Sequence, residues 1–347
     1  MMRQLTTSAL LGAAAFFATA LLAAAPASAQ SPGAFSRLGF GARGVGMGNA
    51  VSADSSASPW YNPALAPFAS RQSLTASVGN LSLDRDLQFI QFATPLQRAG
   101  IAIGLTHAVV SGIDGRNNDG LHTEDYKTSE FAGFLAFGLQ FSERVSGGIG
   151  LQLFRSDLID GLGAVNTVGI DLGLTVRVRK DLRLGLVLDD LLARFSWDSS
   201  GLFSSGGKST TDNFPRRIRL GASHLRMDGR LQLVAEYEAR FSSAEVTRAS
   251  VQLLGDTPIQ SLRSEDLTLR SDLLRAGGQF ALTDFLSVTA GVDRTVGGAG
   301  GAFRPAGGFT LVQSVGALLT NVGYTYAAEP YGLGSAHYIS IRLYLEQ

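Results

Sequence analysis

Hydrophobic and polar residues alternate strictly over much of this chain, most clearly over residues 167–189. Apolar residues occupy every second position from Val168 to Val178, and the alternation resumes at Leu182 after a short polar turn. Successive side chains of a β-strand point to opposite faces. The stretch therefore predicts a hairpin with one apolar face and one polar or small face.

Similar patterns recur along the chain, in segments of about ten residues, which is the length of a tilted membrane-spanning strand. Fourteen such segments are found, at 73–82, 86–95, 99–108, 130–141, 145–155, 166–179, 182–190, 216–225, 230–240, 272–281, 285–294, 305–312, 317–327 and 336–345.

The links between these segments alternate in length. Every second link is short, and only the short link at 83–85 breaks the rule. The long links are 109–129, 156–165, 191–215, 241–271 and 295–304. Short turns at one end and long loops at the other are typical of an outer-membrane barrel, with the short turns periplasmic. We therefore predict an all-β fold, a transmembrane antiparallel β-barrel of about 14 strands, with both chain ends on the periplasmic side.

Charged residues fall on the polar faces of the predicted strands. An arginine that faces lipid at mid-bilayer costs about 2–4 kcal/mol, so these side chains are expected to face the interior. There they form either structural ion pairs or the lining of a polar ligand path or gate. The residues expected to line the lumen are Asp171, Arg177, Arg179, Arg183, Arg217, Arg219, Glu236, Glu238, Arg275 and Asp293.

The N-terminus has the features of a secretory signal peptide, with Arg3, an apolar run over 9–25 and the cleavage motif Ala27-Ser28-Ala29. We expect export to the outer membrane of a Gram-negative-type bacterium. The predicted division of the chain is a signal peptide at 1–29, an N-terminal hatch segment at 30–71 and a barrel at 72–347.

Composition narrows the possible functions. The net charge is zero, so nothing favours a nucleic-acid partner. The chain has no cysteine, and its four histidines show no metal-ligand spacing. A turn-rich loop at 114–120 contains acidic residues but does not fit the calcium-loop rule, and no hydrolase motif occurs. We expect no catalytic, cofactor or metal site.

The segment 33–68 is rich in glycine and does not alternate, yet it is too apolar for a flexible leader. Its Gly39-x-Gly41-x-x-Gly44 pattern matches a dinucleotide fingerprint only formally, because no strand precedes it and no acidic residue follows at the required distance. Asn62 before Pro63 predicts a capped helical turn. Since the segment precedes the first strand, we expect it to fold into the lumen as a plug.

This segment also resembles a known family. Gly41-Ala42-Arg43-x-x-Gly46-Met47-Gly48-x-Ala50, followed by Trp60-Tyr61-Asn62-Pro63-Ala64, is similar to the N-terminal signature of the PorV/PorQ family, within the wider FadL-like outer-membrane barrels. The resemblance implies a fourteen-stranded barrel with an N-terminal hatch. The motif residues that it implies for the hatch are Gly41, Arg43, Gly46, Met47, Gly48, Trp60, Asn62, Pro63 and Ala64.

Two functions follow from the resemblance. The first is a PorV/PorQ-like component of type IX secretion that engages secretion-system subunits or secreted cargo, with the polar loops 191–215 and 241–271 as candidate contact surfaces. The alternative is a FadL-like passive transporter of long-chain fatty acids or other hydrophobic small molecules. In both cases outer-membrane lipid surrounds the barrel.

Overall fold

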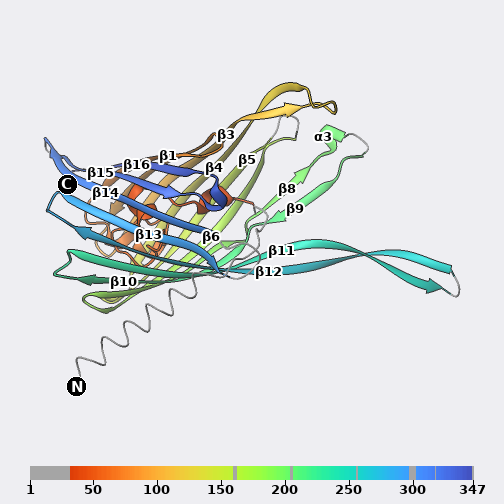
Figure 1. Cartoon of the computed structure of the whole chain (residues 1–347). Helices are drawn as coiled ribbons and strands as arrows, with labels where there is room; N and C mark the ends of the chain where they lie inside the picture. The colour runs from red at the N-terminus through yellow and green to blue at the C-terminus, as the bar shows by residue number, and fades with distance from the viewer. Residues whose placement is uncertain are drawn as a thin grey trace, which may run out of the picture.

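In the computed structural model, the described residues are 32–158, 162–203, 206–254, 257–296, 302–316 and 318–345. Within them, fourteen strands close an antiparallel barrel in the order β1-β16-β15-β14-β13-β12-β11-β10-β7-β6-β5-β4-β3-β2, as Figure 1 shows. Each strand pairs with its neighbour in the chain, and β1 pairs with β16 to close the ring. The predicted fold class is confirmed. The expected signal peptide, residues 1–29, lies outside the described residues.

Each predicted segment corresponds to one barrel strand, and β3, β4, β11 and β12 run well beyond the predicted bounds. Their bounds are β1 Ser73–Leu81, β2 Arg85–Pro95, β3 Ala99–Arg116, β4 His122–Gln140, β5 Val145–Asp157, β6 Val165–Arg179, β7 Leu182–Leu191, β10 Arg216–Arg226, β11 Leu231–Leu254, β12 Thr257–Ala281, β13 Leu286–Val296, β14 Phe303–Val315, β15 Leu318–Ala328 and β16 Ser335–Tyr344. A separate two-stranded hairpin is formed by β8 Arg194–Asp198 and β9 Ser209–Asn213.

The alternation in the sequence becomes an outer apolar surface and a filled interior. On β10, Ile218 and Leu220 are exposed on the outside, whereas Arg217 and Arg219 are buried inside. The same inside–outside alternation is seen along β1, where every second residue is buried. An apolar outer band suits lipid, and ring closure removes the unpaired strand edges that hydrocarbon could not satisfy.

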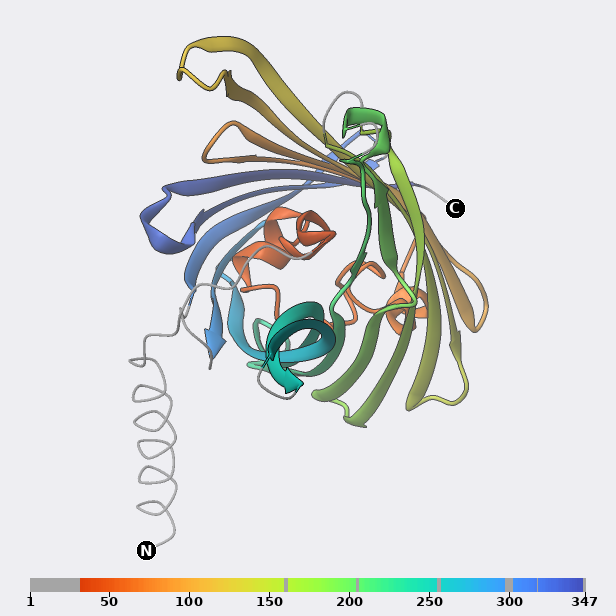
Figure 2. The same cartoon turned by 90° about the vertical axis from the view of Figure 1, so that its right-hand side faces the viewer.

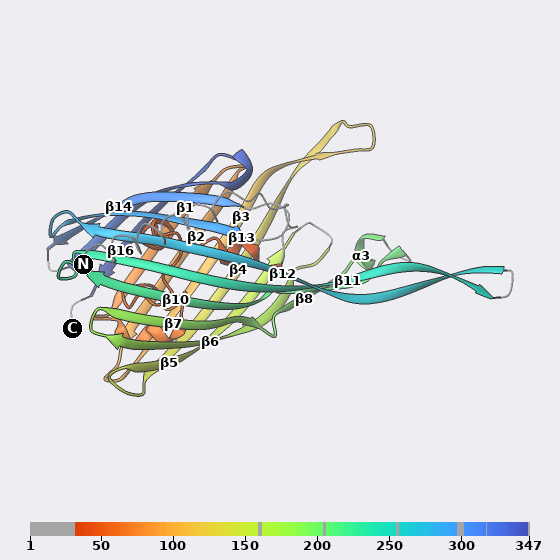
Figure 3. The same cartoon turned by 60° about the horizontal axis from the view of Figure 1, so that its bottom comes forward.

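Two hairpins extend well beyond the barrel at its long-loop end. The strands β3 and β4 continue pairing to Arg116 and His122, with register shifts near the tip. The strands β11 and β12 pair as far as Leu254 and Thr257, so that they form a long ribbon that stands away from the barrel (Figure 3). The sequence pattern predicted both regions, 109–129 and 241–271, as long loops.

The N-terminal segment passes through the whole lumen. Its first described residues, Pro32 and Gly33, lie at the long-loop end beside Leu81 and Val110, whereas Phe68 stacks under Arg183 at the short-turn end. Figure 2 shows the segment inside the ring of strands. The first described residues therefore lie at the end opposite to the one predicted for the start of the chain, whereas both ends of the barrel itself, Ser73 and Tyr344, pair at the short-turn end.

The described helices are short. They are η1 Ala34–Arg37, α2 Ala42–Gly46 and η2 Pro63–Phe68 in the hatch, α3 Ser200–Phe203 beyond β8, and η4 Pro330–Gly332 between β15 and β16. Within the described residues, no helix has the length and apolar character needed to cross a membrane.

The hatch divides the interior into two sides. Towards β2 and β4 it packs through aromatic rings, with Trp60 between Phe40, Phe89 and Phe134 at centroid distances of 4.8–6.1 Å. Towards β7 and β10–β13 it meets a dense group of buried charges. The lumen therefore has one apolar side and one ionic side.

Candidate functional site

The candidate site is the hatch, residues 32–70, together with the wall residues that hold it. Gly41 has a positive φ of 76° and directly precedes α2. The backbone of α2 is hydrogen-bonded to the barrel wall. The Ala42 amide donates to Ser340 Oγ on β16 at 3.2 Å, and Thr325 Oγ1 on β15 donates to the Ala42 carbonyl at 2.6 Å. The hatch is thus fixed beside the strands that close the barrel.

The turn after α2 lies in direct contact with the wall backbone. Met47 is fully buried, and Gly48 has a φ of 65°, which side chains rarely tolerate. A Cβ at Gly48 would lie 2.5 Å from the Val292 carbonyl oxygen, and one at Gly277 would lie 2.7 Å from the Met47 carbonyl carbon. Glycines on both partners allow this approach. Gly46 is similarly close-packed, with Thr289 and Thr325 beside it.

Arg43 binds two side chains of the barrel wall and one of the hatch itself. Its guanidinium donates to Gln279 Oε1 at 2.6 Å, to Gln232 Oε1 at 2.8 Å and to Asp54 Oδ2 at 2.5 Å. Burial alone would raise the pKa of the Asp54 carboxyl, but the Arg43 charge and hydrogen bonds from Gln232 and Ser56 outweigh it and lower this pKa below its ordinary value. Asp54 is therefore held ionised.

The Asn62-Pro63 motif forms the predicted capped turn. Asn62 Oδ1 accepts from the Ala64 amide at 2.9 Å, and Pro63 is the first residue of η2. The other half of the Asn62 amide donates to the Ser52 carbonyl at 2.8 Å. On the wall, Ser146 Oγ donates to the Ala64 carbonyl at 2.8 Å. Asn62 thus caps a helix and joins two parts of the hatch.

Tyr61, the residue between Trp60 and Asn62, has a second fixing role. Its hydroxyl lies 3.0 Å from the Phe40 carbonyl and 2.9 Å from Asn49 Oδ1, and burial raises the pKa of this phenol. The neutral hydroxyl therefore links Tyr61 to Phe40 and Asn49, which lie earlier in the hatch.

A bulge in β7 brings two carboxylates into the lumen. Ile170 pairs with Leu191 and Leu172 with Leu188, so that Asp189 and Asp190 together oppose the single residue Asp171 on β6. Asp190 adopts a φ of 58°, and all three acidic side chains are buried. In a regular strand one of the two β7 carboxylates would point towards lipid. The bulge avoids this cost.

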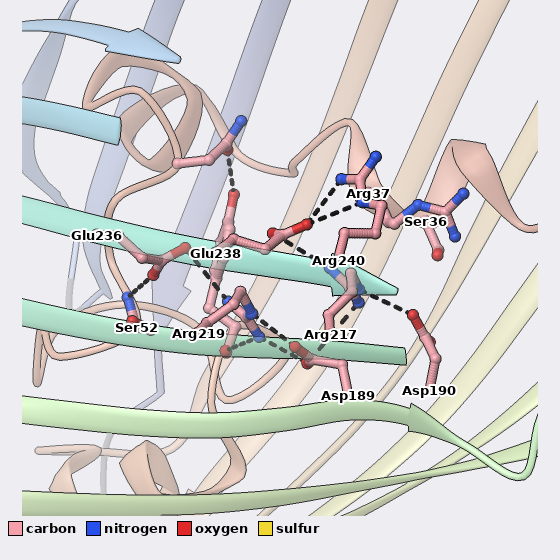
Figure 4. Close-up of polar contacts among 12 residues, drawn as sticks. Ser36, Arg37, Ser52, Asp189, Asp190, Arg217, Arg219, Glu236, Glu238 and Arg240 are labelled. Carbon is pink, nitrogen blue, oxygen red and sulfur yellow. Dashed lines mark hydrogen bonds and ion pairs between the residues drawn. The ribbon is translucent and has the colours of Figure 1, made fainter. Parts of the chain in front are cut away.

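Arginines on the neighbouring strands neutralise these carboxylates (Figure 4). Arg217 Nε donates to Asp190 at 2.9 Å, and Arg219 makes two 2.7 Å bonds to Asp189. Across the next strands, Arg275 binds Glu236 at 2.7 Å and Asp293 at 3.2 Å. We call this the ion-pair cluster; its members are Asp189, Asp190, Arg217, Arg219, Glu236, Glu238, Arg240, Arg275 and Asp293. The predicted lumen residue Asp171 lies beside the cluster, where its carboxylate accepts from Gln152 Nε2 and from the Asp190 amide.

The ion-pair cluster also binds the hatch backbone. Arg219 Nη2 donates to the Tyr61 carbonyl at 2.6 Å, and the Ser52 amide donates to Glu236 Oε2 at 3.2 Å. The space between the hatch and the cluster is about 30 Å³, which is the share of liquid volume of one water molecule. These charges fix the hatch and leave room for about one water molecule between it and Arg217, Arg219 and Arg275.

Three predicted lumen residues lie elsewhere. Arg177, Arg179 and Arg183 are at the short-turn rim, where Arg177 donates to the Glu143 carbonyl at 2.6 Å and the Arg179 side chain is 65% exposed beside Asp181. Arg183 stacks on the Phe68 ring at 4.0 Å. All three arginines lie at the short-turn rim of the barrel. There the inward face of a strand meets solvent, so alternation in the sequence no longer marks a side chain as part of the lumen.

A second aromatic group at the long-loop end was not predicted. The β8–β9 hairpin leans over the mouth of the barrel (Figure 2). Phe195 of β8 and Phe214, which follows β9, are buried with their ring centroids 5.0 Å apart. Phe214 also contacts Phe154 at 4.8 Å, and Phe154 contacts Phe35 at 6.5 Å. The link 191–215, expected as a polar contact loop, thus turns aromatic side chains inward.

An outer cavity of about 380 Å³ lies beside this second aromatic group. It is bounded by η1, the barrel wall from β2 to β5 and the β8–β9 hairpin. Trp60 and Ala108 pack against both aromatic groups, so apolar contacts continue from the outer cavity to the centre of the lumen.

In the part of the chain that the structure describes, one group of acidic and histidine side chains could approach a metal ion. Asp114, His122 and Asp125 lie together, exposed, at the tip of the β3–β4 hairpin. Asp114 is already bonded to Arg116 and to His122 at 2.7 Å.

A closed fourteen-stranded barrel filled by its own N-terminal segment defines the class of fold, a plugged β-barrel. The computed structure is similar to the CymD monoaromatic hydrocarbon channel, with a TM-score of 0.59, 14% sequence identity, and coverage of 88% of this chain and 96% of that one. It is similar to the Pseudomonas putida toluene transporter TodX, with a TM-score of 0.57, 14% identity, and coverage of 88% and 96%. It also resembles a Pseudomonas aeruginosa FadL homologue, with a TM-score of 0.56, 13% identity, and coverage of 92% and 99%.

These likenesses establish the shared fold. No protein-family model matches the chain, and no curated protein matches it by sequence. The wider FadL-like resemblance predicted from the N-terminal motif is thus supported at the level of fold, whereas the narrower PorV/PorQ assignment has no support from these comparisons.

Proposed function

We propose that the protein is an outer-membrane channel through which hydrophobic small molecules diffuse passively, with the hatch as the moving part. The observation that carries the proposal is the apolar side of the lumen, where Trp60 joins the aromatic rings of the centre to those beside the outer cavity. An apolar interior path serves molecules that partition poorly into water.

The solved structures of similar fold support this choice. They are described as a monoaromatic hydrocarbon channel, a toluene transporter and a FadL homologue. A shared fold alone does not fix function, so the interior of this chain has to carry the argument. The comparisons give no support to the expected role in type IX secretion, and we do not propose secretion subunits or cargo as partners.

The hatch fills the lumen, so passage requires it to shift. The hatch contacts with the wall that are described above are non-covalent, for example single hydrogen bonds from Ser146 and Arg219 to hatch carbonyls. Such contacts can break and form again. We propose that the molecule is not an enzyme and that passage needs no cofactor. The expected location is the outer membrane, with the short turns in the periplasm.

A reversible cross-link tests this function. The chain has no cysteine, and Ser52 on the hatch lies against Gly221 on β10. Ser52→Cys with Gly221→Cys would join the hatch to the wall when oxidised. Uptake of radiolabelled ethylbenzene is measured in cells with a lipopolysaccharide outer membrane. We expect the unmodified protein to accelerate this uptake. Oxidation of the double variant should stop the accelerated uptake, and a reductant should restore it.

The two single-cysteine variants, treated identically, are the controls and should keep their uptake under oxidation. Uptake that is no faster with the unmodified protein than without it would reject the transport function. Uptake by the oxidised double variant equal to that of the reduced form would reject hatch movement and leave only a fixed channel.

A further inference from the structure

The outer side of the barrel wall has a notch at the long-loop end, where β7 stops before its neighbours. Ile170 is the first β6 residue that pairs with β7, so β6 has no β7 partner from Val165 to Gly169. On the other side, the pairing of β7 with β10 begins at Arg217, so that Arg216 lies beyond it. The β8–β9 hairpin and the β11–β12 ribbon diverge from this part of the barrel (Figure 1).

A crevice of about 470 Å³ lies at the notch, between the hairpin and the ribbon. Arg194 alternates along β8 with Phe195, which is buried inward, so Arg194 faces outward. Arg216 shares its face of β10 with Ile218, which is exposed on the outside of the barrel. We call this the arginine crevice; the polar and aromatic residues of its outward side are Arg194, Asn213, Arg216, Phe241, Ser243 and Thr268.

Both arginines of the crevice are available to a ligand. Each of them is exposed, and within the described residues neither guanidinium has a hydrogen-bond or ion-pair partner. Asp190 is the one acidic residue among the described residues that line the crevice, and it is buried with its carboxylate 2.9 Å from Arg217 Nε. The arginine crevice therefore offers two positive charges to an anion.

The arginine crevice lies at the edge of the outward apolar band. On the outward face of β10, Leu220 and Ile218 are exposed and apolar, and Arg216 is the next residue of that face. Arg216 pairs with Phe241 of β11, and the outward face of β11 continues with Ser243. Aromatic side chains mark the boundary between hydrocarbon and headgroups in outer-membrane barrels. The two arginines are therefore at the level of lipid headgroups, on the side of the long loops.

A second crevice, of about 650 Å³, adjoins the first on the side of β6. Its apolar lining includes Val168 and Ile170 of β6 and Leu192, which is 73% exposed. Leu192 and Arg194 line both crevices. Charged and apolar surfaces thus meet at one place on the outside of the wall, which suits a molecule with an anionic head and an apolar tail.

We propose that the arginine crevice binds the phosphate of an outer-leaflet glycolipid, lipid A, while an acyl chain lies on Val168 and Leu192. A guanidinium matches the geometry of a phosphate group and can bind it with two parallel hydrogen bonds. Basic pockets beside membrane-spanning elements recognise anionic lipid headgroups in this way. The inference rests on the proposed outer-membrane location and goes beyond the transport function. The bound lipid covers the part of the wall that β7 leaves open.

Native mass spectrometry of the full-length protein, purified and delipidated in a maltoside detergent, tests the site. The probes are lipid A that carries both of its phosphates, the same lipid without phosphates, phosphatidylglycerol and inorganic phosphate. We expect one phosphorylated lipid A to bind per protein. Removal of the phosphates should weaken binding at least about tenfold, because it removes the group that both arginines contact.

Variants assign the bound lipid to the crevice. Arg194→Gln combined with Arg216→Gln should lose at least about tenfold in lipid A affinity. Arg179→Gln, the same change at the exposed short-turn rim, is the matched control and should bind like the unmodified protein. Leu192→Ser should weaken the binding of lipid A by removing apolar contact with its acyl chain. Heat-dependent migration in gels verifies that the barrel of each variant is folded.

Equal binding of lipid A with and without phosphates would overturn the proposal, as would equal binding by the double glutamine variant and Arg179→Gln. Phosphatidylglycerol that binds as tightly as lipid A would reject the glycolipid, and displacement of lipid A by inorganic phosphate would indicate a site for a free anion instead. These results do not depend on uptake. Specific lipid A binding without accelerated ethylbenzene uptake would retain the site and reject transport, and the reverse result would retain transport and reject the site.

Discussion

Arg219 and Asp189 form a two-pronged ion pair across neighbouring strands, with both nitrogen–oxygen distances at 2.7 Å. The same guanidinium donates to the Tyr61 carbonyl of the hatch at 2.6 Å. One arginine therefore neutralises a carboxylate on the inward face of β7 and holds the plug against the wall. Of the two roles expected for the lumen charges, Arg219 thus has that of a structural ion pair, and the proposed hatch movement would break its bond to Tyr61.

Replacing Arg219 should loosen the hatch. Arg219→Met leaves Asp189 buried with only the 3.8 Å contact to Arg217, and breaking such a pair typically costs about 3–5 kcal/mol. We expect a lower midpoint of urea unfolding and faster proteolysis within the hatch. Arg179→Met, which removes an arginine from the exposed rim, is the matched control. Equal behaviour of the two variants would show that Arg219 does not hold the hatch.

Asn62 allows its two roles to be separated. Asn62→Asp keeps the oxygen that caps η2 but loses the donor to the Ser52 carbonyl, whereas Asn62→Ala loses both. Loss of the cap costs about 1 kcal/mol, but Asn62 is fully buried and the aspartate variant places a carboxylate oxygen against the Ser52 carbonyl oxygen, so the aspartate variant should be the less stable. Proteolysis rates of the hatch measure this order. If the aspartate variant is as resistant as the unmodified protein, the Ser52 bond contributes nothing to retention.

The wall glycines should be intolerant of side chains only where the hatch touches them. Gly277→Ala would place a methyl group 2.7 Å from the Met47 carbonyl carbon, whereas Gly133→Ala meets nothing within 4 Å. We expect Gly277→Ala to displace the hatch and increase single-channel conductance in planar bilayers. Gly133→Ala should conduct like the unmodified protein. A silent Gly277→Ala variant would contradict the described contact.

Acid should release the Arg43 contact. The pKa of Asp54 is lowered in the folded protein, so its ionised form stabilises the hatch above the ordinary aspartate pKa, near 4, and this contribution is lost as the pH falls below that value. Conductance measured between pH 7 and pH 3 should rise at the acidic end. Asp54→Asn should remove this step and show a raised conductance at every pH. A step of unchanged size in the variant would assign it to another carboxylate.

The barrel could be predicted from sequence because lipid on one side and a packed lumen on the other impose a two-residue period. That period disappears where neither boundary exists. The extension of β3 beyond Val110 is a strand without an alternating environment, so its residues carry no readable pattern. The strand β11 likewise continues beyond Phe241, past the part that the alternation predicted.

The site was predictable only in part, for similar reasons. Asn62 and Pro63 encode a local turn, and the turn is present. The inward turn of Asp190 depends on a bulge that pairing with β6 creates, and the burial of Phe195 depends on a hairpin that crosses the mouth. Both arise from contacts between distant segments, which a single sequence does not display.

The passage of residues 32–70 along the full length of the lumen constrains how the molecule is made. The ring closes where β1 meets β16, and α2 is bonded to β15 and β16 beside that seam. Chains very rarely thread through finished loops. We expect the N-terminal stretch to be enclosed while the sheet is still open, so that pairing of β1 with β16 completes the wall around a plug already in place.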